Sequence, residues 1–214
     1  MSDVIDRARL IAMLNAAASA LREGRVELAA LDAATGDGDH GTAMGKVADA
    51  IERCAGEASP DVTPGALLKA VGLAVMGIDA GSTGPLYGSL FLGLGEGAAD
   101  AAMLDAACLA VSLEHGRAKL RTCTKAEPGD KTMIDALVPA AEAVLAAAGD
   151  GCAVADALTA AASAARSGAD TTADLPAKFG RARNLGERSI GHVDPGAASM
   201  ALLFEGFNGG FADG

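Results

Sequence analysis

The stretch Thr35–Gly41, TGDGDHG, combines closely spaced glycines with carboxylates. Its glycines match G-x-G-x-x-G, a pattern typical of loops whose backbone N–H groups bind a pyrophosphate. Two of the variable positions, Asp37 and Asp39, carry negative charges that would oppose such an anion. The dinucleotide-binding fingerprint also requires a buried strand before the first glycine, whereas the preceding VELAALDAAT has the composition of a helix. This stretch therefore does not indicate a dinucleotide loop.

Three other common motifs fail on spacing or context. GTAMGKV has three residues between its glycines, where a P-loop has four, and Val47 stands where Ser or Thr would bind magnesium. Twelve positions counted from Asp32 or Asp37 end at Ala43 or Ala48, so the bidentate Glu of an EF-hand is missing. A D-x-D phosphatase needs its first Asp after a hydrophobic strand, and Asp37 follows a predicted helix.

The carboxylates themselves remain to be explained. Asp32 falls near a predicted helix end, and Asp37 and Asp39 lie in a glycine-rich turn, so the three side chains can converge. Hard carboxylate oxygens on a tight loop suit Mg²⁺, which completes its octahedron with phosphate oxygens and water. Alternatively, Asp-Gly forms an ordinary turn and Asp39 caps the next helix. These residues alone leave both interpretations open.

Three further segments are rich in glycine and polar residues: 77–88, 125–139 and 179–197. Each leads into a predicted helix, and the free N–H groups at a helix N-terminus favour anions such as phosphate. We therefore expect these loops and the 35–41 loop to share one end of the molecule.

The elements that position these loops are predicted to be helical. In the N-terminal segment Ser2 is a candidate cap, and apolar residues recur every three or four positions between Ile11 and Leu21. Runs of alternating β-branched residues are absent. The chain is thus predicted to be one all-α domain, 1–214, of about eight helices. Besides the N-terminal helix, the expected spans are roughly 42–57, 64–76, 85–98, 102–125, 131–148, 152–168 and 195–207.

Composition excludes several classes of partner. A net charge of -11 and an aromatic content of 3% argue against nucleic acid and against an anionic membrane surface. No apolar run approaches 18 residues, and the first residues lack the charge pattern of a signal peptide, so we expect a cytoplasmic protein. The cysteines at 54, 108, 123 and 152 have no metal-ligand spacing and are predicted to be reduced core thiols.

Four stretches together resemble a known family: LDAATGDGDHGTAM, GSTGPLYGSLF, AEPGDKTMIDALVP and LGERSIGHVDPGAASM. They resemble, in the same order, the nucleotide-binding L subunit (DhaL type) of dihydroxyacetone kinases, which also occurs as the C-terminal domain of single-chain kinases. The resemblance runs from Leu31 to about Met200. It implies a single-domain barrel of eight antiparallel helices with a nucleotide–metal site at one end.

The resemblance also implies roles for individual residues. Asp32, Asp37 and Asp39 would hold two Mg²⁺ ions that clamp the nucleotide phosphates, so the aspartates would face the phosphates through cations. No catalytic residue is assigned with certainty, and the candidates are His40 and Arg181. The implied nucleotide contacts are His40, Gly41, Thr42, Ala43, Ser82, Thr83, Thr124, Met133, Arg181, Asp194, Pro195 and Gly196.

Some positions depart from the family pattern or have ordinary explanations. Ala80 replaces a glycine of the family's Gly-Ala-Ser-Gly loop and Asp79 is unusual there, so the family pattern does not specify the path of that loop. Thr124 stands where some members have glycine. Arg188 is a further candidate for the phosphate side, with a salt bridge to a neighbouring carboxylate as the alternative. Ordinary structural roles are expected for His115 and His192.

By resemblance, the chain donates a phosphoryl group in one of two ways. The donor is exchangeable ATP, or it is a bound ADP cofactor after a phosphotransferase-system protein (M subunit) has phosphorylated it. The acceptor would be dihydroxyacetone or a related ketose such as erythrulose, held by a separate K subunit outside these 214 residues. We also expect a homodimer or hetero-oligomer. A nucleotide-loaded sensor module without turnover of its own is the alternative, and the sequence leaves open both the sugar and the phosphoryl source.

Overall fold

A computed structural model describes residues 3–214, and most of them are helical. The only strand-like feature in this range is a single antiparallel bridge between Ile5 and Leu104, so the all-α prediction is confirmed. The α-helices are α1 Arg7–Glu23, α2 Arg25–Thr35, α3 His40–Gly56, α4 Pro64–Met76, α5 Thr83–Ala98, α6 Ala106–Leu120, α7 Ile134–Gly149, α8 Val154–Thr171 and α9 Pro195–Asp213; the 3₁₀ helices are η1 Thr172–Asp174 and η2 Ala182–Ser189.

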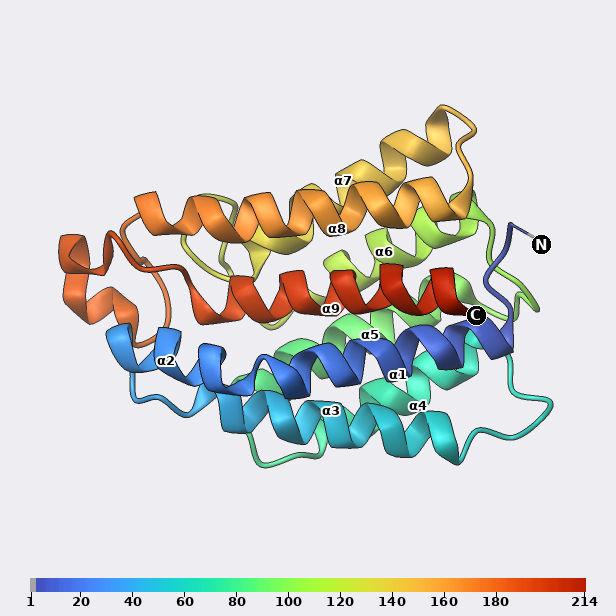
Figure 1. Ribbon diagram of the computed structural model, residues 1–214, viewed down its shortest axis with the longest axis horizontal. Coiled ribbons are helices and arrows are strands. Elements are labelled where there is room, and N and C mark those ends of the chain that lie inside the picture. The colour runs from blue at the N-terminus through green and yellow to red at the C-terminus, as the bar shows by residue number, and fades with distance from the viewer. Residues whose placement is uncertain (1–2) are drawn as a thin grey trace.

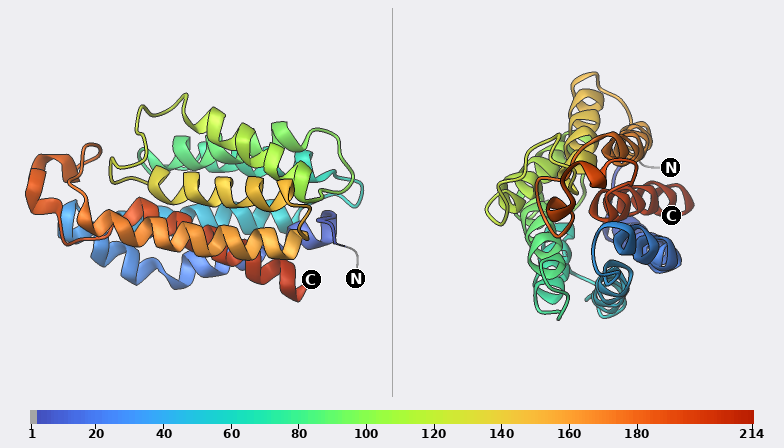
Figure 2. Two further views of the ribbon diagram at one scale, coloured as in Figure 1. Left: turned by 90° about the horizontal axis from the view of Figure 1, so that it is seen from above. Right: turned by 90° about the vertical axis from the view of Figure 1, so that its left-hand side faces the viewer.

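The long helices form a closed barrel (Figures 1 and 2). Around the ring, α1 packs on α3, and α4 to α9 follow in chain order until α9 packs back on α1. The helix α2 stands outside this ring, because the chain bends at Gly24 and α2 packs on α3 and α9. Within residues 3–214 the ring therefore has eight helices, the number that the resemblance implied, with α2 added at one end.

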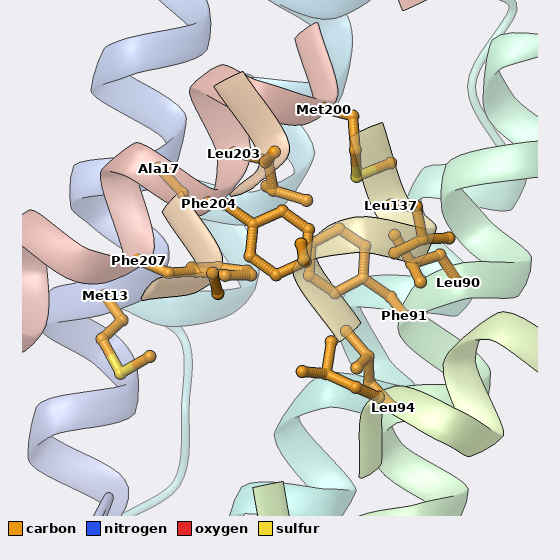
Figure 3. Packing of buried hydrophobic residues seen from close by; sticks show 14 of the residues in the cluster. Met13, Ala17, Leu90, Phe91, Leu94, Leu137, Met200, Leu203, Phe204 and Phe207 are labelled. Atoms are coloured by element: carbon orange, nitrogen blue, oxygen red, sulfur yellow. The ribbon is translucent and has the colours of Figure 1, made fainter. Parts of the chain in front are cut away.

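The interior of the barrel is a packed apolar core (Figure 3). The ring of Phe207 meets Phe91 and Phe204 edge to face, at centroid distances of 6.5 and 6.2 Å. Aliphatic and methionine side chains from α1, α5, α7 and α9 fill the space around these rings. The middle of the barrel is therefore filled by apolar side chains and offers no room for a polar ligand.

Glycines let neighbouring helices approach closely. A Cβ at Gly206 of α9 would overlap the backbone of Ala17 in α1, and one at Gly168 of α8 would overlap the carbonyl oxygen of Asp135 in α7. Small residues at such crossings bring helix backbones within direct contact. The glycine content of this chain thus serves helix packing as well as loops.

Several predicted helix boundaries were wrong. Ser2, the predicted first cap, lies outside the described residues, and α1 instead starts after Asp6, whose side chain accepts a bond from Arg9 N at 2.9 Å. The helix predicted over 102–125 is shorter, because Asp105 caps α6 by accepting from Cys108 N at 2.8 Å. The residues after α6 form turns that lead to the ligand-sized cavity described below.

Two further predictions need correction. The helix predicted from 131 begins at Ile134, because Lys131 has a left-handed backbone with φ of 61°. The cysteines are unpaired thiols but none is buried in the core: Cys123 and Cys152 are exposed, and the other two are half-buried. Spacing indicates the absence of a metal motif, but it does not tell which face of a helix a thiol occupies.

The irregular segment between α8 and α9 projects beyond one end of the barrel, at the left of Figure 1. The chain termini lie at the opposite end. Among residues 3–214, no helix has both the length and the apolar character needed to cross a bilayer.

Candidate functional site

Three aspartates cluster where α2 gives way to α3, and we call them the aspartate cluster. Asp32 lies in the last turns of α2, and Asp37 and Asp39 lie in the loop, with one ligand oxygen from each within 4.8 Å of the others. A Cβ at Gly36 would lie 2.5 Å from Asp32 Oδ1, so glycine makes room for that carboxylate. Gly38 has φ of 79°, the left-handed conformation that glycine adopts readily.

The glycine-containing turn of the turn-and-cap interpretation is present, but the predicted cap by the Asp39 side chain is not. Asp39 occupies the N-cap position of α3, but its side chain makes no capping bond. Asp32 Oδ2 accepts the bond from His40 N instead, at 3.1 Å. Asp37 forms an ion pair with Arg181, which comes from the segment between α8 and α9. Three converging carboxylates with few hydrogen bonds or ion pairs to the protein fit a hard divalent cation such as Mg²⁺.

A cavity of about 530 Å³ opens beside the aspartate cluster. Its volume is in the range of small-molecule and cofactor sites. All three predicted metal ligands, Asp32, Asp37 and Asp39, line it. Most residues predicted to contact a nucleotide also line it: His40, Ser82, Thr83, Thr124, Met133, Arg181, Asp194, Pro195 and Gly196. Gly41, Thr42 and Ala43 do not line it; they form the first turn of α3, where Gly41 packs against the backbone of α2.

Four helices begin at this cavity. The first residues of α3, α5, α7 and α9, namely His40, Thr83, Ile134 and Pro195, all line it. A helix N-terminus presents free N–H groups and a partial positive charge. The expectation that the glycine-rich loops meet at one end is therefore confirmed, and the cavity suits a ligand that is both anionic and metal-bound.

A partly buried chain of hydrogen bonds holds the side chain of His40. Its Nε2 lies 2.8 Å from Ser199 Oγ, and Tyr87 Oη lies 2.8 Å from the same oxygen. Ser199 Oγ also donates to the carbonyl of Gly196 at 3.0 Å. Burial lowers the pKa of the His40 imidazole and raises the pKa of the Tyr87 hydroxyl. Sequence reasoning missed Tyr87 and Ser199, although both fall inside the quoted motifs.

The loop before α5 carries the departures from the family pattern. Lys46 of α3 donates to the carbonyl oxygen of Asp79 at 2.5 Å, so the backbone of Asp79 is the bonded group. Ala80 and Gly81 follow and line the cavity, with φ of 54° at Gly81. Ser82 occupies the N-cap position of α5 without a side-chain capping bond, which leaves its hydroxyl available to a ligand.

The opposite wall is formed by the start of α9 and the loop before α7. Asp194 Oδ2 caps α9 by accepting from Ala197 N at 2.8 Å, and burial raises the pKa of Asp194 to about 7. Sequence reasoning did not select Lys131 and Cys123, which also line the cavity. Cys123 Sγ lies 3.0 Å from Ser89 Oγ. Both residues stand in or beside the 125–139 segment, but nothing in their types or spacing distinguished them.

His115, His192 and the further candidate Arg188 are not among the residues that line the cavity. His115 is exposed on α6, and Arg188 is exposed in η2. His192 contributes its backbone: its carbonyl oxygen accepts a bond from Lys131 Nζ.

The chain is similar both to part of longer kinases and to most of a shorter kinase subunit. A D-erythrulose kinase of Mycolicibacterium smegmatis is 39% identical over 197 residues, which is 91% of this chain but 34% of that protein. The ADP-binding subunit DhaL of the PEP-dependent dihydroxyacetone kinase of Escherichia coli is 36% identical over 179 residues, 83% of this chain and 84% of that subunit. The chain thus spans about a third of the erythrulose kinase and most of the DhaL subunit.

A solved structure of similar fold is the dihydroxyacetone kinase of C. freundii in complex with AMP-PNP and Mg²⁺. It matches with a TM-score of 0.70 and 27% identity, covering 94% of this chain and 33% of that one. Residues 34–209 also match the DAK2 domain family. The matched range includes two members of the aspartate cluster and every loop around the cavity. The chain therefore belongs to the DAK2 domain family.

Proposed function

We propose that the chain is the nucleotide-binding, phosphoryl-donating subunit or domain of a short-chain ketose kinase. One observation carries the proposal: the aspartate cluster and four helix N-termini meet around a single cavity of about 530 Å³. A nucleotide polyphosphate with its metal ions satisfies both charge patterns at once. The family's relatives support the same assignment, since one is named as an ADP-binding kinase subunit and another was solved with AMP-PNP and Mg²⁺.

In this proposal Asp32, Asp37 and Asp39 hold two Mg²⁺ ions. Bound Mg²⁺ neutralises the charge of the phosphate oxygens, which is the main requirement of phosphoryl transfer. The chain's own groups orient the nucleotide: the first turn of α3, with its backbone N–H groups, and the hydroxyls of Ser82 and Thr83 contact the phosphates. That first turn consists of His40, Gly41, Thr42 and Ala43; only His40 lines the cavity, so the other three would act through their backbone. The remaining proposed contacts are Arg181 on the phosphate side, and Thr124, Met133, Asp194, Pro195 and Gly196 on the nucleoside side.

Transfer joins a terminal hydroxyl oxygen of the ketose to phosphorus while the bond from phosphorus to the nucleotide breaks. The ketose, dihydroxyacetone or a tetrose such as erythrulose, is held by a K subunit or domain that docks over the cavity mouth. The phosphoryl source is ATP, or ADP recharged by a phosphotransferase-system M subunit. We further propose a cytoplasmic assembly, as a homodimer or in a hetero-oligomer with the K subunit.

A nucleotide-loaded sensor is the competing function, because the same cavity would serve a module that only reports its phosphorylation state. Transfer itself separates the two. A sensor would bind Mg-nucleotide but would phosphorylate no ketose with any K subunit.

The first test is native mass spectrometry of the purified protein, followed by calorimetric titration of the nucleotide-free protein with Mg-ATP and Mg-ADP. Retained ADP supports the variant recharged by an M subunit, and reversible ATP binding supports the ATP-dependent variant. Transfer is then assayed with a K subunit and both ketoses. Failure of the protein to bind either Mg-nucleotide would refute the proposed function.

A further inference from the structure

Lys131, in the loop before α7, is a lysine whose side chain is buried inside the protein. It is 2% exposed, and a buried ammonium group requires hydrogen-bond acceptors. Its Nζ donates to the carbonyl oxygen of Thr172 at 2.5 Å and to that of His192. Thr172 follows the last residue of α8, and His192 lies shortly before α9. One side chain thus joins three segments that are far apart in sequence.

Thr172 extends this connection to the start of α9. Its Oγ1 accepts a bond from Asp194 N at 2.8 Å and donates to the carbonyl of Ala169 within α8. Asp194 in turn caps α9 through Ala197 N. The end of α8 and the start of α9 are therefore fixed to each other next to the ammonium group of Lys131.

Met133 lies beside the turn at Gly196. A Cβ placed on Gly196 would lie 3.5 Å from Met133 N and 3.6 Å from Met133 Cβ, which is van der Waals contact. Met133 is two residues beyond Lys131, and both Met133 and Gly196 line the cavity. We call Lys131, Met133, Thr172, His192 and Asp194–Gly196 together the lysine wall.

The backbone around Lys131 directs its side chain inward. Lys131 has φ of 61°, which is uncommon for a residue other than glycine. On either side of it, Gly129 N and Thr132 N donate to the carboxylate of Asp135, at 2.5 and 2.7 Å. Burial lowers the pKa of Lys131, and the carboxylates of Asp194 and Asp135 oppose that shift. The loop is therefore built around the inward-facing lysine.

We propose that Lys131 is a positioning residue of the nucleotide site, which holds Met133 against the Asp194–Gly196 turn and so sets the shape of the nucleoside side of the cavity. The inference rests on the proposed function, because that function assigns the nucleoside to this wall. Lys131 acts through the residues it ties together, since its bonded acceptors are main-chain carbonyls. The aspartate cluster comes from α2 and the loop before α3, so its metal binding is independent of Lys131.

The test compares Lys131→Met with Lys125→Met, which removes a charge from the exposed part of the same loop. Calorimetry measures the Kd of Mg-ADP and of Mg-pyrophosphate, and paramagnetic resonance measures Mn²⁺ binding to the aspartate cluster. Lys131→Met is expected to raise the Kd of Mg-ADP at least about tenfold, because a displaced wall misplaces the nucleoside. Its affinities for Mg-pyrophosphate and Mn²⁺ should match those of Lys125→Met. A general loss of structure would instead lower these affinities as well.

Equal Mg-ADP affinity in Lys131→Met and Lys125→Met would overturn the proposal, as would a parallel loss of ADP, pyrophosphate and Mn²⁺ binding. If Lys131→Met fails to fold, Thr172→Val carries the same comparison, because it removes the hydroxyl that accepts from Asp194 N and keeps the side-chain shape. A selective loss of Mg-ADP affinity in Thr172→Val supports the wall, and unchanged affinity overturns it.

Hydrogen exchange without nucleotide separates this inference from the proposed function. Amides of residues 192–198 should exchange faster in Lys131→Met, or in Thr172→Val, than in Lys125→Met. Unchanged exchange would overturn the proposal that Lys131 holds this segment in place. A wild-type protein that binds no Mg-nucleotide would refute the proposed function, whereas the exchange result would still decide whether Lys131 holds this segment.

Discussion

The charged groups on the two sides of the cavity differ in sign and in exposure to solvent. The aspartate cluster consists of carboxylates that are exposed or half-exposed, all within eight residues of sequence. The lysine wall has a buried ammonium group bonded to carbonyl oxygens 41 and 61 residues away. Exposed like charges repel one another and need an added cation, whereas a buried charge needs fixed partners. One side is thus suited to an exchangeable metal and the other to a fixed shape.

The largest expected effect is on the aspartate cluster. Asp37→Ala removes a proposed metal ligand and should abolish measurable Mg-nucleotide binding, a loss of at least about a thousandfold, or about 4 kcal/mol. Helicity should be retained, because the carboxylates repel one another without metal. Calorimetry measures the nucleotide affinity and circular dichroism measures the helicity, with Asp61→Ala in the loop between α3 and α4 as control. Retained affinity together with lost helicity would contradict both.

The second prediction concerns the support of the lysine wall. In Gly168→Ala the new Cβ would overlap the carbonyl oxygen of Asp135, the residue that anchors the loop around Lys131. Forcing α8 away from α7 should lower the free energy of unfolding by about 2–3 kcal/mol. Urea denaturation measures this, with Gly149→Ala as control because nothing lies within 4 Å of its added Cβ. Mn²⁺ binding should persist in both variants, and its loss in Gly168→Ala would show that the two sides are not independent.

A pH effect of about 2 kcal/mol is expected from Asp194. Burial raises its pKa in the folded protein to about 7 from 3.8. Between these pH values Asp194 is ionised in the unfolded chain but keeps its proton in the folded protein. Its contribution to stability is therefore complete below pH 3.8 and is lost as the pH rises to about 7. The free energy of unfolding falls by at most about 1.4 kcal/mol per pH unit over this range. Asp194→Asn keeps a cap acceptor and cannot ionise. Urea denaturation between pH 5 and 8 should therefore show a flatter pH dependence for the variant; parallel curves would rule out a raised pKa.

The smallest effect tests the geometry of the aspartate cluster without removing a ligand. In Gly36→Ala the new Cβ would lie 2.5 Å from Asp32 Oδ1 and displace that carboxylate. Mn²⁺ affinity should fall about tenfold, as for other residues that orient a metal ligand. Gly56→Ala is the control, since its added Cβ has no neighbour within 4 Å. An unchanged affinity would mean that Asp32 is not held in place by the space at Gly36.

Much of this molecule could be predicted from sequence because the information is local. Apolar periodicity and glycine or proline breaks predicted the helices, and four motifs predicted the family and the barrel. Asp32, Asp37 and Asp39 are close in sequence, so a short glycine-containing loop necessarily keeps them close in space. The predicted ends of α6 were wrong, because they depend on the Asp105 cap and on turns after Leu120, in a stretch whose composition still favours helix.

The sequence by itself thus determined the helices, the family and the aspartate cluster. Tertiary structure alone decided that Lys131 faces inward and bonds to Thr172 and His192, and that Tyr87 and Ser199 hold His40. The reason is physical: the partners of a buried polar group come from whichever distant segments the closed barrel brings beside it. Neither residue type nor spacing along the chain specifies those neighbours.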